Sequence, residues 1–213
     1  MRASKSLTAL QRCALARSDR LRLVAALPKS GSALDRQTAF VVVEAHSLWS
    51  SYCRSFYLSC AFAARDRTGT HVLGRHAAYA TEQDALTRAI YAVKPQYQQA
   101  GRTGPWTPYD EPAWADPLVF GRALSDLAPT NLGTVRSALA ARPAALNQLA
   151  TFRNFYAHRG IVAARKVQRL ATSYRLHTSL HPTGLLNSFG YGRPQVVLAD
   201  LIDDIRTTIQ LMN

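Results

Sequence analysis

The 213-residue chain is predicted to be all-α. Apolar residues recur at steps of three and four over most of its length, and prolines and glycines gather in a few segments between these runs. A chain of this size buries a substantial core without disulfides or structural metals. We therefore expect one domain over 1–213, a helical bundle with an inserted middle segment.

The first two predicted elements are an N-terminal arm and a long helix. Residues 1–30 are basic, with Asp19 as their one acidic residue, and their leucine spacing predicts a short amphipathic arm that contacts RNA or packs on the body. An organelle transit peptide has a similar composition and is the alternative for this segment. The long helix is predicted over 32–65, because Leu48, Tyr52 and Phe56 follow a helical period without proline or glycine.

The middle of the chain is predicted to be an elaborated insertion between core helices. Thr81 and Asp84 have the spacing of a capping box, and Asp116 followed by Pro117 has the pattern of an N-cap with a first-turn proline. The stretch 100–117 is rich in proline and glycine and predicts an ordered loop. The insertion spans 66–141, with helices over 81–93, 117–127 and 130–141.

The last third is predicted to contain three helical runs. One begins near Pro143 and continues toward His158, where Gly160 ends or kinks it before a second run to about Tyr174. A loop over 183–194 precedes the last helix. That helix is expected over 195–212, with an apolar stripe formed by Leu198, Leu201, Ile202, Ile205, Ile209 and Met212.

Charge is the clearest global feature of the chain. Its net charge is +13, and no acidic residue lies between Asp126 and Asp200, whereas nine basic residues do. This predicts a polyanionic partner, nucleic acid first and an acidic membrane surface second, with a solvated basic helix face as the alternative. No apolar run is long enough to span a membrane. The three cysteines contain no CxxC pair and predict reduced thiols in a cytoplasmic protein.

Histidine and arginine are the candidate residues for chemistry. The histidine pairs lack nearby cysteine or carboxylate ligands, so neither a metal nor another cofactor is expected. Cleavage of RNA without a metal needs a base for the 2′-hydroxyl, an acid for the departing 5′-oxygen and a cation for the phosphate charge. Arg153 and His158 supply groups of these types.

The spacing of this pair is not specific by itself. Arg65–His71 and Arg175–His181 have similar spacings, but a turn signal interrupts the first pair and Pro182 follows the second. Arg153 and His158 lie about 140° apart around a straight helix, so they share a site only if the arginine reaches around or the helix loosens. The alternative is a basic helix end that complements the helix dipole.

The stretch "FRNFYAHRG", residues 152–160, resembles the active-site motif of the HEPN superfamily. These are all-helical domains, often metal-independent ribonucleases of bacterial defence and toxin–antitoxin systems. In the family pattern an Arg is followed, after four to six residues, by a His, and a polar residue commonly follows the Arg; Arg153, Asn154 and His158 match it. Segments 42–57 and 193–205 look like a first and a closing helix, so the resemblance covers about half the chain and implies four core helices.

The resemblance also implies a composite site. One Arg153–His158 pair supplies a single titrating group, and HEPN ribonucleases bring two copies together, so a homodimer is expected in which one His158 is the base and the other the acid. Two features depart from the family. Gly160 stands where some HEPN toxins carry a tyrosine that a partner antitoxin modifies, and the 66–141 insertion exceeds a minimal four-helix domain.

The predicted function is a metal-independent endoribonuclease, acting as a toxin or phage-defence effector with a possible antitoxin or defence-system partner protein. Its expected catalytic residues are Arg153, His158 and Asn154, and its expected RNA-binding residues are Arg159, Arg54 and Arg165. The alternative is a HEPN-like module without turnover that binds nucleic acid, nucleotide or a partner protein. A basic DNA-binding protein is a third reading, although no helix-turn-helix spacing is present.

Overall fold

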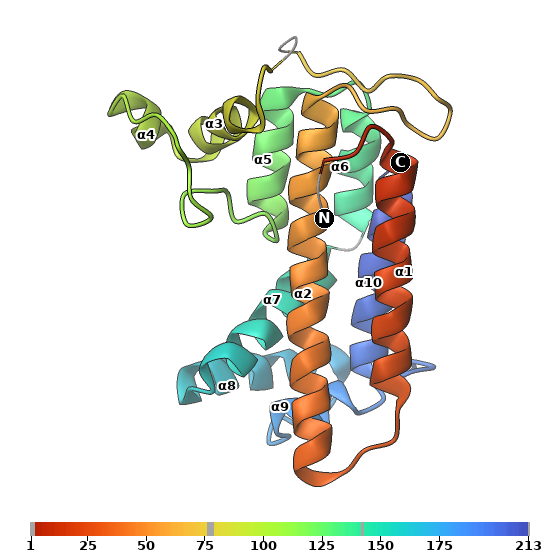
Figure 1. Cartoon of the computed structure of the whole chain (residues 1–213). Coiled ribbons are helices and arrows are strands. Elements are labelled where there is room, and N and C mark those ends of the chain that lie inside the picture. Colours follow the sequence, from red (N-terminus) through yellow and green to blue (C-terminus); the bar gives the residue numbers. More distant parts are fainter. Residues whose placement is uncertain (1–2, 76–78, 142, 213) are drawn as a thin grey trace. The chain divides into compact units, whose positions relative to one another are not determined.

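A computed structural model describes residues 3–75, 79–141 and 143–212 of the chain (Figure 1). The all-α prediction is confirmed, because these three ranges contain helices and isolated bridges but no strand. The α-helices are α1 Leu7–Ala26, α2 Gly31–Ala61, α3 Glu82–Val93, α4 Pro95–Gln99, α5 Pro117–Leu127, α6 Leu132–Ala141, α7 Pro143–His158, α8 Ile161–Leu170, α9 Pro182–Leu186 and α10 Val197–Leu211, with a short 3₁₀ helix at Ala171–Tyr174.

The chain forms two compact units. The first unit contains Met1–Ala14, Trp49–Ala141 and Thr208–Asn213, and the second contains Leu15–Leu48 and Arg142–Thr207. Residues of α1, α2 and α10 are divided between the two. None of the described helices is long and apolar enough to cross a membrane.

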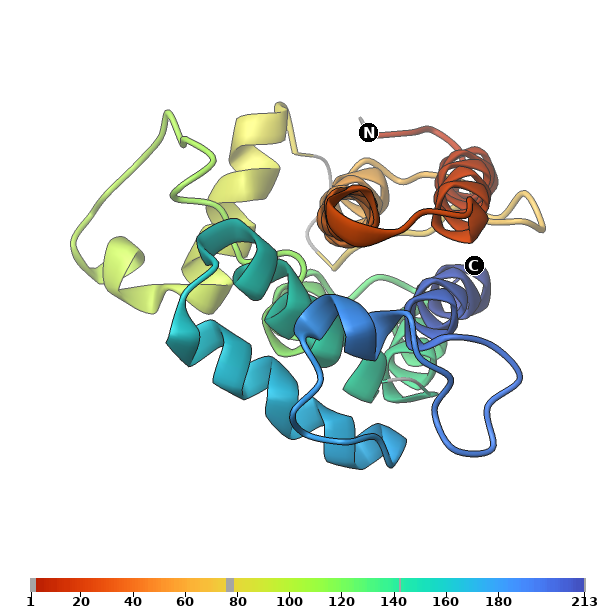
Figure 2. The same ribbon diagram turned by 90° about the horizontal axis from the view of Figure 1, so that it is seen from below.

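The first unit has an aromatic core on α2 and α5. Trp49, Phe56 and Phe120 are fully buried, and Phe120 makes edge-on contacts with the other two rings. Helix α3 lies beside α5 (Figures 1 and 2), where the Arg88 guanidinium donates to both carboxylate oxygens of Asp126 at 2.6 and 2.7 Å. The predicted caps are confirmed, because Thr81 and Asp84 form a reciprocal capping box and Asp116 caps α5.

The predicted loop over 100–117 is held by two buried tryptophans and by partly buried polar contacts. Trp106 and Trp114 are 6% and 4% exposed, and the Trp114 indole donates to the Glu111 carboxylate at 2.7 Å. Glu111 also accepts two hydrogen bonds from Arg54 of α2, at 2.7 and 3.0 Å. These contacts hold the loop to α2 within the first unit.

Most of the segment expected to be an amphipathic N-terminal arm is the 20-residue helix α1. Leu7, Leu10, Ala14 and Leu21 form a buried stripe on it, so the segment is part of the packed body. Of the cysteines, Cys53 and Cys60 are buried and Cys13 is exposed. Burial raises the pKa of both the Cys53 and Cys60 thiols, which suits inert core residues.

Ion pairs connect the helices of the second unit. The portion of α1 that belongs to this unit forms one ion pair with α2 and two with α10. All six side chains are partly exposed, so each ion pair adds little stability. These ion pairs are Arg17–Glu44 at 3.7 Å, Arg22–Asp203 at 3.2 Å and Arg206–Asp19 at 3.0 Å. Helix α8 follows α7 in this unit after a short turn, which Figures 1 and 2 both show.

The turn between α7 and α8 differs from the expected glycine break. Helix α7 ends at His158, and Arg159 takes the left-handed conformation with φ of 50°. Gly160 has an extended conformation and is the N-cap of α8. The chain therefore reverses at an arginine, although glycine adopts the left-handed conformation at lower cost.

Candidate functional site

Helix α7 presents three polar side chains on one face. Thr151, Asn154 and His158 are separated by three and four residues, which places them one above another on a helix. Asn154 and His158 are exposed, whereas Phe152 and Phe155 on the opposite side are buried. The burial of the aromatic face thus determines which residues of the motif meet solvent.

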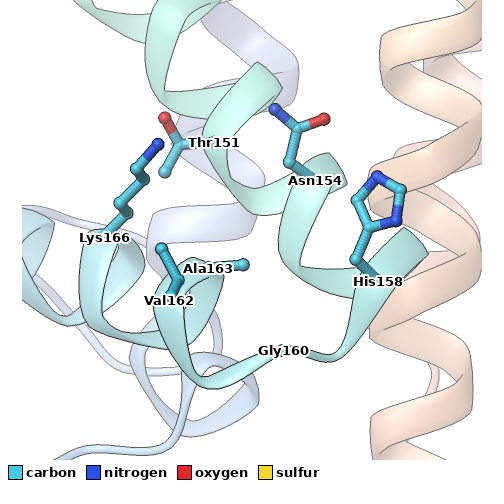
Figure 3. A pocket seen from close by; sticks show the side chains of 7 residues that line it. All are labelled: Thr151, Asn154, His158, Gly160, Val162, Ala163 and Lys166. Carbon is cyan, nitrogen blue, oxygen red and sulfur yellow. The ribbon is translucent and has the colours of Figure 1, made fainter.

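This face forms one wall of an open groove between α7 and α8. The groove has a volume of about 440 Å³ and is lined by Thr151, Asn154, His158, Gly160, Val162, Ala163 and Lys166. Figure 3 shows Asn154 and His158 on consecutive turns of α7, with Lys166 of α8 reaching toward Thr151. An amide, an imidazole and an ammonium group therefore line one open groove.

Arg153 does not line the groove, although it contacts a residue that does. Its Nη1 donates a hydrogen bond to Oδ1 of Asn154 at 3.3 Å. Helix α7 stays regular through Arg153 and His158, so the angle between the two side chains persists. The structure thus places Asn154 and His158 in one groove and connects Arg153 to it through the Asn154 amide.

A second histidine lies within electrostatic range of Arg153. His46 of α2 is half-buried, and burial together with the Arg153 charge lowers its pKa to about 4. Its ring is therefore neutral at physiological pH. Because both effects disfavour the imidazolium, His46 does not add positive charge beside the arginine.

His158 differs from the described histidines outside this region in having no fixed partner. His71 bonds the carbonyl of Ala63 at 2.7 Å, and His177 bonds Ser179 at 2.6 Å. His181 caps α9 by accepting from the backbone N–H of Thr183. No hydrogen bond holds the His158 ring within the described residues, so both ring nitrogens are available to a ligand.

Arg159 is engaged in a network at the end of α7. Its guanidinium pairs with Asp35 of α2 at 2.8 Å and lies over the Tyr156 ring, 4.8 Å from the centroid. The Asp35 carboxylate also accepts from the Thr183 hydroxyl, which bonds the hydroxyl of Tyr156 at 3.0 Å. Burial raises the pKa of Asp35, but the hydrogen bonds from Thr183 and Arg159 outweigh that effect and lower it overall.

The other two expected RNA-binding arginines do not line the groove. Arg165 lines a separate shallow hollow with Gln168, Arg169 and Thr178. Arg54 belongs to the first unit, where Glu111 and Glu82 occupy its donors. Burial opposes the charge of Arg54, but these hydrogen bonds raise its pKa, which fits a structural cation.

Sequence analysis did not single out Lys166 or Thr151. The position of both residues in the groove depends on the α7–α8 turn, because residues at similar distances before and after the turn of a helical hairpin face each other. A signal was present in the sequence, because the segment that forms α8 contains three cations, Arg165, Lys166 and Arg169, and no acidic residue. The described residues contain no cluster of three or more His, Cys, Asp or Glu side chains that could hold a metal ion.

Comparison with known proteins identifies no relative of this chain. No protein-family model matches the sequence, no curated protein matches it, and no solved structure matches its fold. The chemistry of the groove is therefore argued from its own residues.

Proposed function

We propose that the chain is a HEPN-like, metal-independent endoribonuclease of the cytoplasm whose site is the α7–α8 groove. The observation that carries this proposal is the His158 imidazole, which is exposed, has no protein partner and shares the groove with an amide and a cation. In phosphodiester cleavage without a metal, an imidazole can serve as the base or the acid, and a cation can stabilise the charge on the phosphate. The motif "FRNFYAHRG" supplies two of the three groove groups.

In the proposed reaction, the 2′-oxygen of the RNA attacks the adjacent phosphorus and the bond from phosphorus to the 5′-oxygen breaks. A base takes the 2′-hydroxyl proton, and an acid gives a proton to the departing 5′-oxygen. The products are a 2′,3′-cyclic phosphate and a 5′-hydroxyl end. Asn154 orients the phosphate by hydrogen bonding.

Each groove contains one titratable imidazole, whereas the reaction needs two proton-transfer groups. We propose that a second copy of the chain supplies the other His158, in a two-fold homodimer that apposes the two grooves. A toxin or phage-defence role, restrained by a partner protein, is the cellular setting that we propose for such an activity.

The test uses the purified full-length chain with a labelled single-stranded RNA in excess chelator. We expect cleavage to cyclic phosphate ends, and we expect none with the matching DNA, which lacks the 2′-hydroxyl. His158→Ala should lower the rate by about 10²- to 10⁴-fold, with circular dichroism and thermal melting unchanged. Retained cleavage in this variant would refute the site, and RNA binding without cleavage by the native chain would favour the binding module.

The composite site has its own test, in dimers that combine one native chain and one His158→Ala chain carrying different tags. If each site uses both imidazoles, the activity of the mixed dimer should fall to that of the dimer in which both chains carry His158→Ala. Half of the native activity in the mixed dimer would contradict the composite site. Full activity of a chain that is monomeric at the assay concentration would also contradict it.

A further inference from the structure

Among the described residues of α7 and α8, Lys166 is the lysine or arginine that lines the groove between these helices. It lies in the same space as Asn154 and His158, and Figure 3 shows its side chain extending along the groove. Its ammonium group forms no hydrogen bond or ion pair within the described part of the chain. It is therefore available to a ligand.

The neighbouring arginines are engaged or directed elsewhere. Arg159 is paired with Asp35 at 2.8 Å, and Arg153 donates to Asn154 at 3.3 Å. Arg165 and Arg169 line the other hollow on α8. The groove thus differs in its cation from the arrangement that the motif alone suggests, in which Arg153 meets the phosphate.

The surroundings of Lys166 favour an anion. No carboxylate occurs in the sequence between Asp126 and Asp200, so the whole α7–α8 hairpin lacks an acidic side chain that could neutralise the ammonium. An ammonium on a four-carbon stem can follow a phosphate as charge develops on it, and charge-assisted hydrogen bonds are about twice as strong as neutral ones. The volume of about 440 Å³ lies in the range of small-ligand pockets.

We propose that the groove is a phosphodiester-binding site in which Lys166 binds the phosphate beside His158. Arg153 is a positioning residue that acts through the Asn154 amide. The assignment of this phosphate as the one that is cleaved rests on the proposed function, whereas its binding does not.

The binding test titrates the full-length chain with a deoxyribose dinucleoside monophosphate, which has the phosphodiester but no 2′-hydroxyl, and follows the His158 and Asn154 resonances by NMR. Lys166→Gln should weaken binding about tenfold, whereas Lys166→Arg should restore most of it. The matched control is Arg122→Gln, which removes one positive charge from an exposed residue of α5 in the first unit. Equal weakening by Lys166→Gln and Arg122→Gln would overturn the proposal, because it would show only a general effect of charge.

Inorganic phosphate serves as the second probe. A loss of phosphate binding in Lys166→Gln that matches the loss for the dinucleotide supports direct contact with the phosphate group. Unchanged binding of both probes in Lys166→Gln refutes that contact.

The role of Arg153 is tested by a double-mutant cycle with Asn154 on RNA cleavage. If Arg153 acts through the amide, Arg153→Ala and Asn154→Ala should each slow cleavage, the double variant should be no slower than Asn154→Ala, and Arg153→Lys should recover part of the rate. Additive losses would show that Arg153 contacts the substrate itself.

The binding and cleavage measurements separate the two proposals. Lys166-dependent binding without any cleavage would overturn the nuclease and keep the phosphodiester site. Cleavage that depends on His158 but not on Lys166 would keep the nuclease and overturn the role of Lys166.

Discussion

At the residue scale, His158 of the motif and His46 of α2 have opposite environments. His158 is exposed and without a fixed partner, whereas His46 is half-buried beside the charge of Arg153. The first environment leaves the ring nitrogens available to a ligand. The second holds a ring neutral, because burial and a nearby cation both penalise the imidazolium.

His46 should make folding sensitive to mild acid. The folded chain binds a proton at His46 only near pH 4, whereas the unfolded chain binds it near the ordinary value of 6.5. The unfolded state therefore holds more protons between these values, and stability falls as the pH falls through that window. We expect a loss on the order of 2 kcal/mol for this half-buried ring.

The measurement is urea unfolding of the native chain and of His46→Gln between pH 7 and pH 4. The variant should lose less stability over this range than the native chain does. Parallel curves for the two proteins would contradict the role given to His46.

The sequence predicts Asn154 and His158 as site residues because their identities and spacing are local features. It does not predict the Arg153–Asn154 hydrogen bond or the groove position of Lys166. The first depends on a rotamer, and the second depends on how the chain folds back after Arg159. Neither is contained in the spacing of the motif.

At the scale of the element, local signals were sufficient for most helix ends. The capping box at Thr81 and the N-cap at Asp116 appear where the sequence places them. The turn after α7 was not predictable in this way, because the left-handed Arg159 pairs with Asp35, which lies more than a hundred residues earlier in the chain. A long-range ion pair accompanies an arginine at a position where the local pattern favours glycine.

Removal of the Asp35 carboxylate should destabilise the second unit. Asp35→Ala leaves the Arg159 guanidinium without its acid and the Thr183 hydroxyl without its acceptor, and we expect a loss of about 1 to 3 kcal/mol in the free energy of unfolding. Because the pKa of Asp35 is lowered by folding, its contribution is present above the ordinary aspartate value and is lost as the pH falls through the folded value.

The control is Glu44→Gln, which removes the longer ion pair with Arg17, at 3.7 Å compared with 2.8 Å for Arg159 and Asp35. We expect a change below about 1 kcal/mol there. If Asp35→Ala costs no more than Glu44→Gln in the same thermal and urea melts, the network does not hold the turn.

At the scale of the whole molecule, the charge of +13 and its distribution bear on affinity more than on fold. The division into two compact units was not predicted, since the helical periods of α1, α2 and α10 continue across the unit boundaries without a linker signal. Composition reports the kind of partner, whereas the units follow from long-range packing.

RNA binding should depend on salt through the cations of α8. Arg165, Lys166 and Arg169 are exposed, and three phosphate contacts on a single strand predict about a fourfold loss of affinity for each doubling of salt. Substitution of all three residues by Gln should reduce the dependence of RNA affinity on salt concentration.

The charge-matched control replaces Arg12, Arg67 and Arg122, exposed residues of the first unit, by Gln. Fluorescence anisotropy against salt concentration compares the two triple variants. If RNA affinity falls with salt concentration at the same slope in both variants, the attraction is diffuse, and this result would count against α8 as the contact surface.

The exposure of Cys13 on α1, with Cys53 and Cys60 fully buried, gives the native chain one reactive thiol. A maleimide probe or nitroxide label should therefore attach at Cys13 without mutagenesis, while the other two thiols react only after unfolding. In a two-fold assembly, a single label per chain yields a single inter-label distance. The cysteine pattern thus allows a distance measurement between labels on the native chain to detect whether two copies associate.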